Sequence, residues 1–408
     1  MNYAWFEKIA PHLAGSPLVL IGFILLLAYG IHWQLIKSGL LSKVDKKDSG
    51  LIIRLFLRYG FWLALTLPLA EFSLAAEKTG SPANKAAAAA ARSLCASSSM
   101  NNPKEALAAC QKAVDLDPDN AEGWNQLGSL FLRTGELVEA EAAYRKLLTL
   151  GGTKEWQAKA VGNLGIVYSI RGDLTQAEEM HKKALALDEA LGSKKGMANQ
   201  YGNLGIVYSI RGDLTQAEEM HKKALALDEA LGSKEGMAAN YGNLGLVYAA
   251  RGDLAQAEEM HRKALALHEA LGSKEGMAIN YGNLGNVYAT RGDLAQAEEM
   301  HRKALAMNEA VGSKEGMARD YGNLGNVYET RGNLAKAEEM LRKALALYEA
   351  LGSKEGMAVN YGNIGNVYKK RGELDKAEEL WKKSLRLFKE IGHPNAKNVQ
   401  EWLDDLGK

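Results

Sequence analysis

The chain has 408 residues, and its 50 Lys and Arg against 49 Asp and Glu give a formal net charge of +1. This balance excludes the strongly basic face that a nucleic-acid-binding protein needs, so no nucleic-acid partner is expected. Only 7 prolines and 7% aromatic residues favour helices over sheets. The two cysteines, Cys95 and Cys110, are too few for a disulfide scaffold, and their spacing fits no metal site.

Two apolar stretches near the start of the chain predict a membrane anchor over residues 1–76. Residues 18–31 carry no charge, and residues 59–76 form a second apolar stretch that Pro68 and Glu71 interrupt. We expect transmembrane helices at about 17–36 and 57–76, followed by a linker over residues 77–86. The alternative for the second stretch is a helix that lies in the membrane interface.

The segment between the two stretches predicts the side of the membrane on which the rest of the chain lies. Residues 37–58 contain two acidic residues, Asp45 and Asp48, and six basic ones: Lys37, Lys43, Lys46, Lys47, Arg54 and Arg58. The positive-inside rule assigns such a segment to the cytoplasm. Two spans in the cytoplasmic (inner) membrane then put residues after 76 on its extracytoplasmic side. If residues 59–76 do not span, these residues are cytoplasmic.

From Ala158 onward the sequence repeats with a period of forty residues, and residues 162–194 are identical to residues 202–234. A fixed period of this size is typical of a solenoid, in which each unit buries its apolar face only against its neighbours. Apolar residues recur at helical spacing on both sides of Gly212. Each unit is therefore predicted to be a helical hairpin.

The tetrapeptide Arg-Gly-Asp-Leu lies between the two predicted helices of four units, at 171–174, 211–214, 251–254 and 291–294. Arg-Gly-Asp is also a tripeptide that animal adhesion receptors bind. The later units have Asn333 and Glu373 at the Asp position, which a receptor ligand would not tolerate. We therefore interpret the motif as a turn, in which Gly212 ends the first helix in a left-handed conformation. Asp213 and Gln216 would form a capping box for the second helix.

The repeat unit resembles the tetratricopeptide repeat. Residues 121–154 carry the pattern of that family almost whole, at Trp124, Leu127, Gly128, Phe131, Ala140 and Tyr144. The forty-residue length is similar to that of the long-helix variant in kinesin light chains and in spindle G-protein regulators. The resemblance implies an all-α fold, a right-handed superhelix of helical hairpins over residues 87–391. We expect units at about 87–120, 121–157, 158–197, 198–237, 238–277, 278–317, 318–357 and 358–391, and a capping helix over 392–408.

The resemblance also implies that the first helix of each unit lines a concave wall that binds a protein partner. On it we expect a column of asparagines, Asn163, Asn203, Asn243, Asn283, Asn323 and Asn363. Three residues later a variable column reads Ile166, Ile206, Leu246, Asn286, Asn326 and Asn366, and a further column includes Ile170, Ile210, Thr290 and Thr330. We expect the aliphatic half to take apolar side chains, the polar half to take polar ones, and Lys369 and Lys370 to favour acidic groups. The alternative for the asparagines is hydrogen bonding between repeats.

Residues that could suggest chemistry have simpler interpretations. His181, His221, His261 and His301 occupy an aromatic packing position, and adjacent hairpins about 8–10 Å apart cannot share one zinc ion. No catalytic motif or cofactor site is present in the sequence, so we expect no enzyme activity. Cys95 and Cys110 would face each other across the first hairpin and could form a disulfide in an oxidising compartment.

Together these features predict a membrane-anchored scaffold that binds a segment of another protein on its concave surface. The alternative is a structural solenoid that assembles with further copies of itself through its near-identical units.

Overall fold

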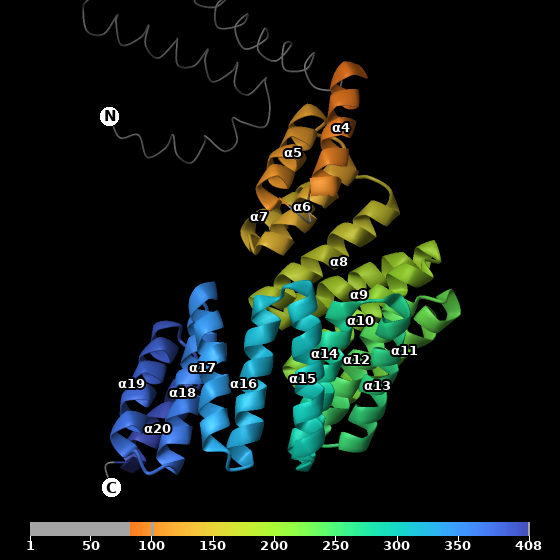
Figure 1. Cartoon of the computed structure of the whole chain (residues 1–408). Coiled ribbons are helices and arrows are strands. Elements are labelled where there is room, and N and C mark those ends of the chain that lie inside the picture. The colour runs from red at the N-terminus through yellow and green to blue at the C-terminus, as the bar shows by residue number, and fades with distance from the viewer. Residues whose placement is uncertain (1–81, 99–101, 407–408) are drawn as a thin grey trace, which may run out of the picture. The chain divides into compact units, whose positions relative to one another are not determined.

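The structure is a computed structural model that describes residues 82–98 and 102–406, and within those ranges it contains helices and no strands (Figure 1). The chain divides into two compact units, Met1–Thr134 and Gly135–Lys408. The segments 17–36 and 57–76, for which we expect membrane spans, lie outside the described residues. None of the described helices is long and apolar enough to cross a bilayer.

The first unit contains α4 (Pro82–Ser98), α5 (Pro103–Leu116) and α6 (Ala121–Thr134). Helix α4 begins at Pro82, within the segment 77–86 that the sequence analysis treats as a linker. A proline is tolerated in the first turn of a helix, and the alanines that follow have the highest helix propensity. Pro82 and the alanines that follow it therefore favour a helix that begins at residue 82. At the next helix, the Asn102 side chain caps α5 by accepting a hydrogen bond from the Glu105 backbone N–H.

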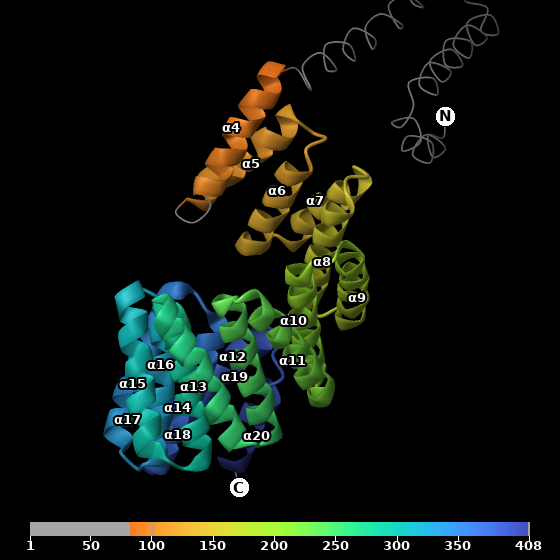
Figure 2. The same cartoon turned by 90° about the vertical axis from the view of Figure 1, so that its right-hand side faces the viewer.

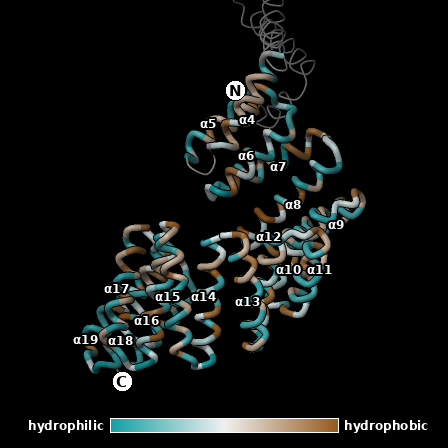
Figure 3. The backbone as a smooth tube through the Cα atoms, turned by 45° about the vertical axis from the view of Figure 1, so that its right-hand side comes forward, coloured by the Kyte–Doolittle hydropathy of each residue, from teal (hydrophilic) through white to brown (hydrophobic). Residues whose placement is uncertain are grey.

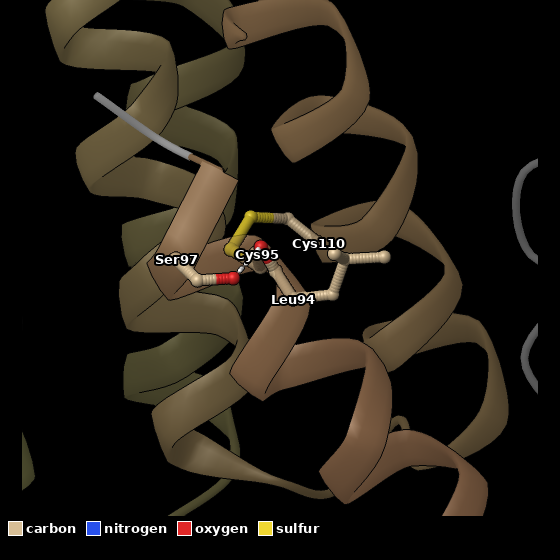
Figure 4. The surroundings of a disulfide bond; sticks show 4 residues. All are labelled: Leu94, Cys95, Ser97 and Cys110. Carbon is tan, nitrogen blue, oxygen red and sulfur yellow. Dashed lines mark hydrogen bonds between the residues drawn. A yellow bond between two sulfur atoms is a disulfide. The ribbon is translucent and has the colours of Figure 1, made fainter. Parts of the chain in front are cut away.

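Cys95 of α4 and Cys110 of α5 face each other inside this unit and are joined as a disulfide, with their Cα atoms 5.0 Å apart (Figure 4). Beside them, the Ser97 hydroxyl donates a hydrogen bond to the Leu94 carbonyl at 3.1 Å. Both cysteines are buried in an apolar cluster with Leu127. The spacing that a disulfide needs is therefore present. The redox state of the pair in the cell stays a prediction.

The second unit is a series of antiparallel helices that begins with α7 (Leu137–Thr149). Six hairpins follow, in which the first and second helices are here called the A and B helices. The A helices are α8 (Lys154–Arg171), α10 (Lys194–Arg211), α12 (Lys234–Arg251), α14 (Lys274–Arg291), α16 (Lys314–Thr330) and α18 (Lys354–Lys370). The B helices are α9 (Leu174–Leu191), α11 (Leu214–Leu231), α13 (Leu254–Leu271), α15 (Leu294–Val311), α17 (Leu334–Leu351) and α19 (Leu374–Glu390). Helix α20 (Ala396–Leu406) packs on α19 at the C-terminal end of the series.

The hairpins begin four residues earlier than the predicted units, for example at Lys194 rather than at 198. Gly192 ends the preceding B helix in a left-handed conformation, with φ of +65°. The Ser193 side chain then caps the next A helix by accepting a hydrogen bond from the Gly196 N–H at 3.1 Å. The Gly-Ser dipeptide is thus the physical boundary between hairpins, whereas Ala158, which set the predicted register, is a buried residue inside α8.

The turn within each hairpin has the predicted conformation at its glycine. Gly212 ends α10 with φ of +88°, which confirms the left-handed position. The capping-box prediction is wrong, because Asp213 is the N-cap residue of α11 but its side chain makes no capping hydrogen bond. Its carboxylate lies 4.0 Å from the Arg211 guanidinium.

A recurrent three-residue contact joins each A helix to the hairpin before it. The Tyr208 hydroxyl and the Arg211 guanidinium both donate to the Glu178 carboxylate of α9, at 2.9 and 2.7 Å. The same contact, here called the clamp, recurs at six junctions, where Glu141, Glu178, Glu218, Glu258, Glu298 and Glu338 each bind the Tyr and Arg of the next A helix. A hydrogen bond from Lys182 is the largest cause that lowers the pKa of Glu178 to about 2, so this carboxylate stays charged. The arginine of the Arg-Gly-Asp motif therefore stabilises the packing of its A helix on the preceding helix.

The core of the second unit is shared between successive hairpins. Leu204 and Tyr208 of α10 and Ala217 of α11 form one buried cluster with Val247 of the next hairpin. Apolar and polar segments alternate along the helices (Figure 3), as expected when one face of each helix is buried. Figure 2 shows the same helices from a second direction. No hairpin could bury its apolar face without its neighbours, which is the physical basis of a solenoid.

Candidate binding groove

A groove with a volume of about 870 Å³ crosses α8, α10 and α12 of the second unit. It brings together five residues predicted to line the wall: Asn163, Asn203, Asn243, Ile166 and Ile206. The three asparagines are half-buried. An amide offers both a donor and an acceptor, so this column can hydrogen-bond to the backbone of a bound segment whatever its sequence.

Aliphatic side chains stand exposed along the same helices. Ile206 and Leu246 are 40% and 51% exposed, and Ile170 and Ile210 are each 59% exposed. Ile206 lines the groove itself, whereas Leu246, Ile170 and Ile210 lie outside its lining. Burial of such side chains under a partner contributes about 25 cal/mol for each Å² of apolar surface removed from water. The N-terminal half of the wall is therefore suited to apolar side chains.

The floor of the groove is a buried chain of hydrogen bonds between neighbouring hairpins. His181 Nδ1 lies 3.0 Å from Gln200 Oε1, and Gln200 Nε2 lies 3.4 Å from Asp188 Oδ2. An amide oxygen only accepts, so the neutral histidine must carry its proton on Nδ1. The next hairpin repeats the arrangement with His221, Asn240 and Asp228. Here the last hydrogen bond, from Asn240 Nδ2 to Asp228 Oδ2, is 2.9 Å long.

Asp188 and Asp228 are groove residues that the sequence analysis missed. Both lie near the ends of B helices, and that analysis assigned the wall to A helices alone. The column to which they belong does vary from repeat to repeat: Asp188, Asp228, His268, Asn308 and Tyr348. That variation is the sequence signal that could have drawn attention to this position.

A smaller cavity of about 300 Å³ lies between α14 and α16 and brings together five predicted residues: Asn286, Thr290, Asn323, Asn326 and Thr330. The hydroxyls of Thr290 and Thr330 each donate at 2.9 Å to a backbone carbonyl of the same helix, so they remain acceptors for a ligand. The polar half of the wall thus exists as a separate and shallower site.

The remaining predicted residues line neither cavity: Asn283, Asn363, Asn366, Lys369 and Lys370. Asn363 Nδ2 donates to Asn326 Oδ1 at 3.1 Å, so hydrogen bonding between repeats does occur at this junction. Lys370 Nζ pairs with Glu329 at 2.8 Å, and Lys369 Nζ lies 5.6 Å from the centre of the Trp381 ring. The structure therefore gives no support to the expectation that these lysines attract acidic groups.

The four repeat histidines are packing residues. His181, His221, His261 and His301 are at most 1% exposed, and each ring packs against a glycine of its own A helix. Burial lowers the pKa of His221, His261 and His301 to about 4, so these rings are neutral at pH 7. In the part of the chain that the structure describes, no three His, Cys, Asp or Glu side chains gather closely enough to hold a metal ion.

Comparison with known families agrees with the helical hairpins and their spacing. Tetratricopeptide repeat profiles match residues 119–190, 196–270 and 276–350, and further profiles of this kind match 87–120 and 361–391. These matches cover more than half of the chain. It belongs to the tetratricopeptide repeat family. A sequence comparison with curated proteins found no match.

Solved structures share this fold at low sequence identity. A signal-transduction ATPase with a tetratricopeptide repeat sensor from Pyrococcus horikoshii is 20% identical, with a TM-score of 0.61 over 78% of this chain. The chain spans 48% of that protein. The apo form of RapI is 16% identical, with a TM-score of 0.55 over 67% of this chain and 98% of its own. TPR-like repeats of a kinesin light chain candidate from Podosopora anserina give 19% identity and a TM-score of 0.40, over 47% of this chain and 94% of theirs.

The two likenesses with TM-scores of 0.61 and 0.55 show the fold alone. Membership of the tetratricopeptide repeat family indicates a scaffold for protein–protein interaction, and a groove lined by amides and aliphatic side chains is compatible with that role.

Proposed function

We propose that this protein is a membrane-anchored scaffold that holds a segment of another protein in the groove across α8, α10 and α12. The observation that carries the proposal is the combination, in one cavity of about 870 Å³, of an amide column with the aliphatic side chains of Ile166 and Ile206. The amides suit the backbone of an extended or helical segment, and the aliphatic positions suit its apolar side chains.

A photo-crosslinking residue at position 206 of the full chain tests this proposal in native membranes. We expect a partner to be captured from position 206. It should not be captured from position 219, where Glu219 is exposed on the B helix α11 and pairs with Lys223. Equal capture at both positions, or capture at 219 alone, would argue against the groove as the binding site.

Substitution of the amide column measures its contribution once the partner is known. The triple variant Asn163→Ala, Asn203→Ala and Asn243→Ala should weaken binding at least tenfold, because each lost buried hydrogen bond costs about 1–3 kcal/mol. The affinity is measured by titration after circular dichroism shows an unchanged fold. A loss below twofold would mean that the column does not touch the partner. Glu219→Ala and Glu259→Ala, on exposed faces of α11 and α13, are the matched control.

We also propose that the repeats lie outside the cytoplasmic membrane, on the strength of the basic segment 37–58 between the two apolar stretches. A reporter enzyme that works only outside the cytoplasm, fused after residue 408, should be active. A cytoplasmic reporter at the same place should be silent. The opposite pattern would put the repeats in the cytoplasm.

The pair Cys95 and Cys110 gives an independent test of this location, because disulfides persist in oxidising compartments. Thiol labelling of the denatured, unreduced protein from native membranes should find no free cysteine. Two labelled cysteines would contradict the expected bond and would weaken the extracytoplasmic assignment.

A further inference from the structure

Two largely buried carboxylates lie in the groove across α8, α10 and α12. Asp188 and Asp228 are only 6% and 7% exposed, yet both line the cavity. Neither takes part in a salt bridge within the described residues. The hydrogen bonds recorded for their side chains come from neutral amides, those of Gln200 and Asn240. A buried carboxylate that lacks a charged partner is costly, because it has left water without gaining an opposite charge.

The fold makes room for these carboxylates. A Cβ atom added at Gly196 would lie 2.1 Å from Asp188 Oδ1, and one added at Gly236 would lie 2.3 Å from Asp228 Cγ. Any larger residue at 196 or 236 would displace the acid. The amides of Gln200 and Asn240, held in turn by His181 and His221, fix each carboxylate from the other side.

The other charged groups that line the cavity do not neutralise the two acids. Lys159 Nζ pairs at 2.8 Å with Glu155, which also lines the groove. Lys195 is exposed at the start of α10 and makes no salt bridge within the described residues. Burial is the main cause that raises the pKa of both Asp188 and Asp228, and the amide hydrogen bonds oppose it only in part. Each acid would therefore be stabilised by a cation that entered through the groove.

We infer that the segment bound in this groove is basic as well as apolar, with Lys or Arg side chains that pair with Asp188 and Asp228 while aliphatic side chains pack on Ile166 and Ile206. This inference rests on the proposed function and names the chemistry of its partner. Adjacent hairpins lie about 8–10 Å apart, and an extended chain rises about 3.3 Å per residue. The two basic residues should therefore be two or three positions apart.

The charge preference should be confined to this end of the solenoid. In later hairpins the same position holds His268, Asn308 and Tyr348, none of which is a carboxylate. Asn308 also supplies a test, because the fold already accommodates asparagine at this position. Asp188→Asn and Asp228→Asn are therefore conservative changes that remove charge with little change of shape.

The experiment uses the full chain in a neutral detergent and three fluorescent decapeptides, in which leucine alternates with lysine, glutamine or glutamate. Fluorescence anisotropy at low salt measures the affinity of each. We expect the Leu-Lys peptide to bind at least tenfold more tightly than the Leu-Gln peptide, and the Leu-Glu peptide to bind most weakly. The variant with Asp188→Asn and Asp228→Asn should lose this preference. The control variant with Glu219→Gln and Glu259→Gln has the same change of net charge on exposed helix faces and should keep it.

The outcomes separate this inference from the proposed function. If the preference for lysine survives Asp188→Asn and Asp228→Asn, the two acids are not its cause and the inference is overturned. If the control variant also loses the preference, the attraction is non-specific and the inference is likewise overturned. If all three peptides bind equally well and Asn203→Ala weakens their binding, the inference is overturned, but the groove is supported as a binding site. If no groove substitution affects binding, or if no peptide binds at concentrations up to about 1 mM, the result counts against both the inference and the proposed function.

Discussion

Replacement of Gly245 by alanine should destabilise the solenoid, whereas the same replacement at Gly242, three residues earlier in α12, should stabilise it. At position 245 the new Cβ atom would lie 2.6 Å from His261 Cε1 and 2.7 Å from both ring nitrogens. The His261 ring is fully buried and cannot swing out of the way. At position 242 the nearest atom, Asn280 Oδ1, would be 3.8 Å away, which is an ordinary contact.

The sizes of the two effects follow from packing and helix propensity. Alanine in place of glycine stabilises a helix interior by about 1 kcal/mol, which is the expected gain for Gly242→Ala. At Gly245 a clash that outweighs this gain should leave a net loss of about 1–3 kcal/mol. Urea denaturation followed by circular dichroism measures both. In the double variant Gly245→Ala and His261→Ala the clash is gone, so the glycine change should cost much less than it does alone. Equal effects at 242 and 245 would mean that the ring does not restrict this position.

Replacement of Asp320 by asparagine should stabilise the protein at pH 7. Asp320 is fully buried, and its Oδ2 accepts a hydrogen bond from Asn308 at 2.6 Å, while its Oδ1 has no partner in the described structure. The equivalent positions in four of the other five hairpins hold neutral amides, those of Gln200, Asn240, Asn280 and Asn360. Here the acid, Asp320, lies on an A helix and its amide partner on a B helix, whereas Asp228 lies on a B helix and Asn240 on an A helix. Asparagine would remove the buried charge and keep the shape.

The gain should depend on pH in a definite direction. Burial raises the pKa of Asp320 to about 6 from 3.8, so the folded state favours the protonated acid. The penalty is nearly absent below the unfolded pKa of 3.8, grows between 3.8 and about 6, and is complete above about 6. Asp320→Asn should therefore gain about 2–3 kcal/mol at pH 7 and about 0.5 kcal/mol at pH 4.

The buried histidines change the stability with pH in the opposite direction to Asp320. They are present in both the wild type and the Asp320→Asn variant. The pKa values of His221, His261 and His301 are lowered to about 4 from 6.5. Their contribution is complete above pH 6.5 and is lost as the pH falls towards 4. The difference between wild type and Asp320→Asn isolates the acid, provided urea midpoints are measured at both pH values. Asp253→Asn, at an exposed N-cap without a capping hydrogen bond, is the matched control. A gain of equal size at pH 4 and pH 7 would contradict the buried-charge explanation.

The repeat period and the glycine between the two helices were enough to predict the hairpins, because both are local signals. The left-handed turn at Gly212 follows from residue type alone. A capping role for Asp213 does not follow in the same way, because it depends on the orientation of the side chain. The hairpin register was four residues late because Ala158 marks a buried position, whereas the Gly192–Ser193 dipeptide marks a physical end.

The groove was predicted less completely than the fold. The asparagine column was assigned to the wall from the resemblance to tetratricopeptide repeats, and Asn163, Asn203 and Asn243 do line the groove. The floor could not, because Asp188 comes from a B helix and contacts Gln200 of the next hairpin, twelve residues later in the chain. Such a contact depends on how two hairpins pack and not on the local pattern of either. The pairing of Lys370 with Glu329 was missed for the same reason.

The clamp has a consequence for how the chain can vary in length. Each hairpin carries a glutamate on one side and a tyrosine and an arginine on the other, so the clamp residues of any hairpin match those of any other. Deletion of residues 194–233 would join Ser193 to Lys234 and bring Tyr248 and Arg251 to the separations from Glu178 that Tyr208 and Arg211 now have. A gene duplication or deletion of whole hairpins would therefore lengthen or shorten the series without leaving a clamp residue unmatched.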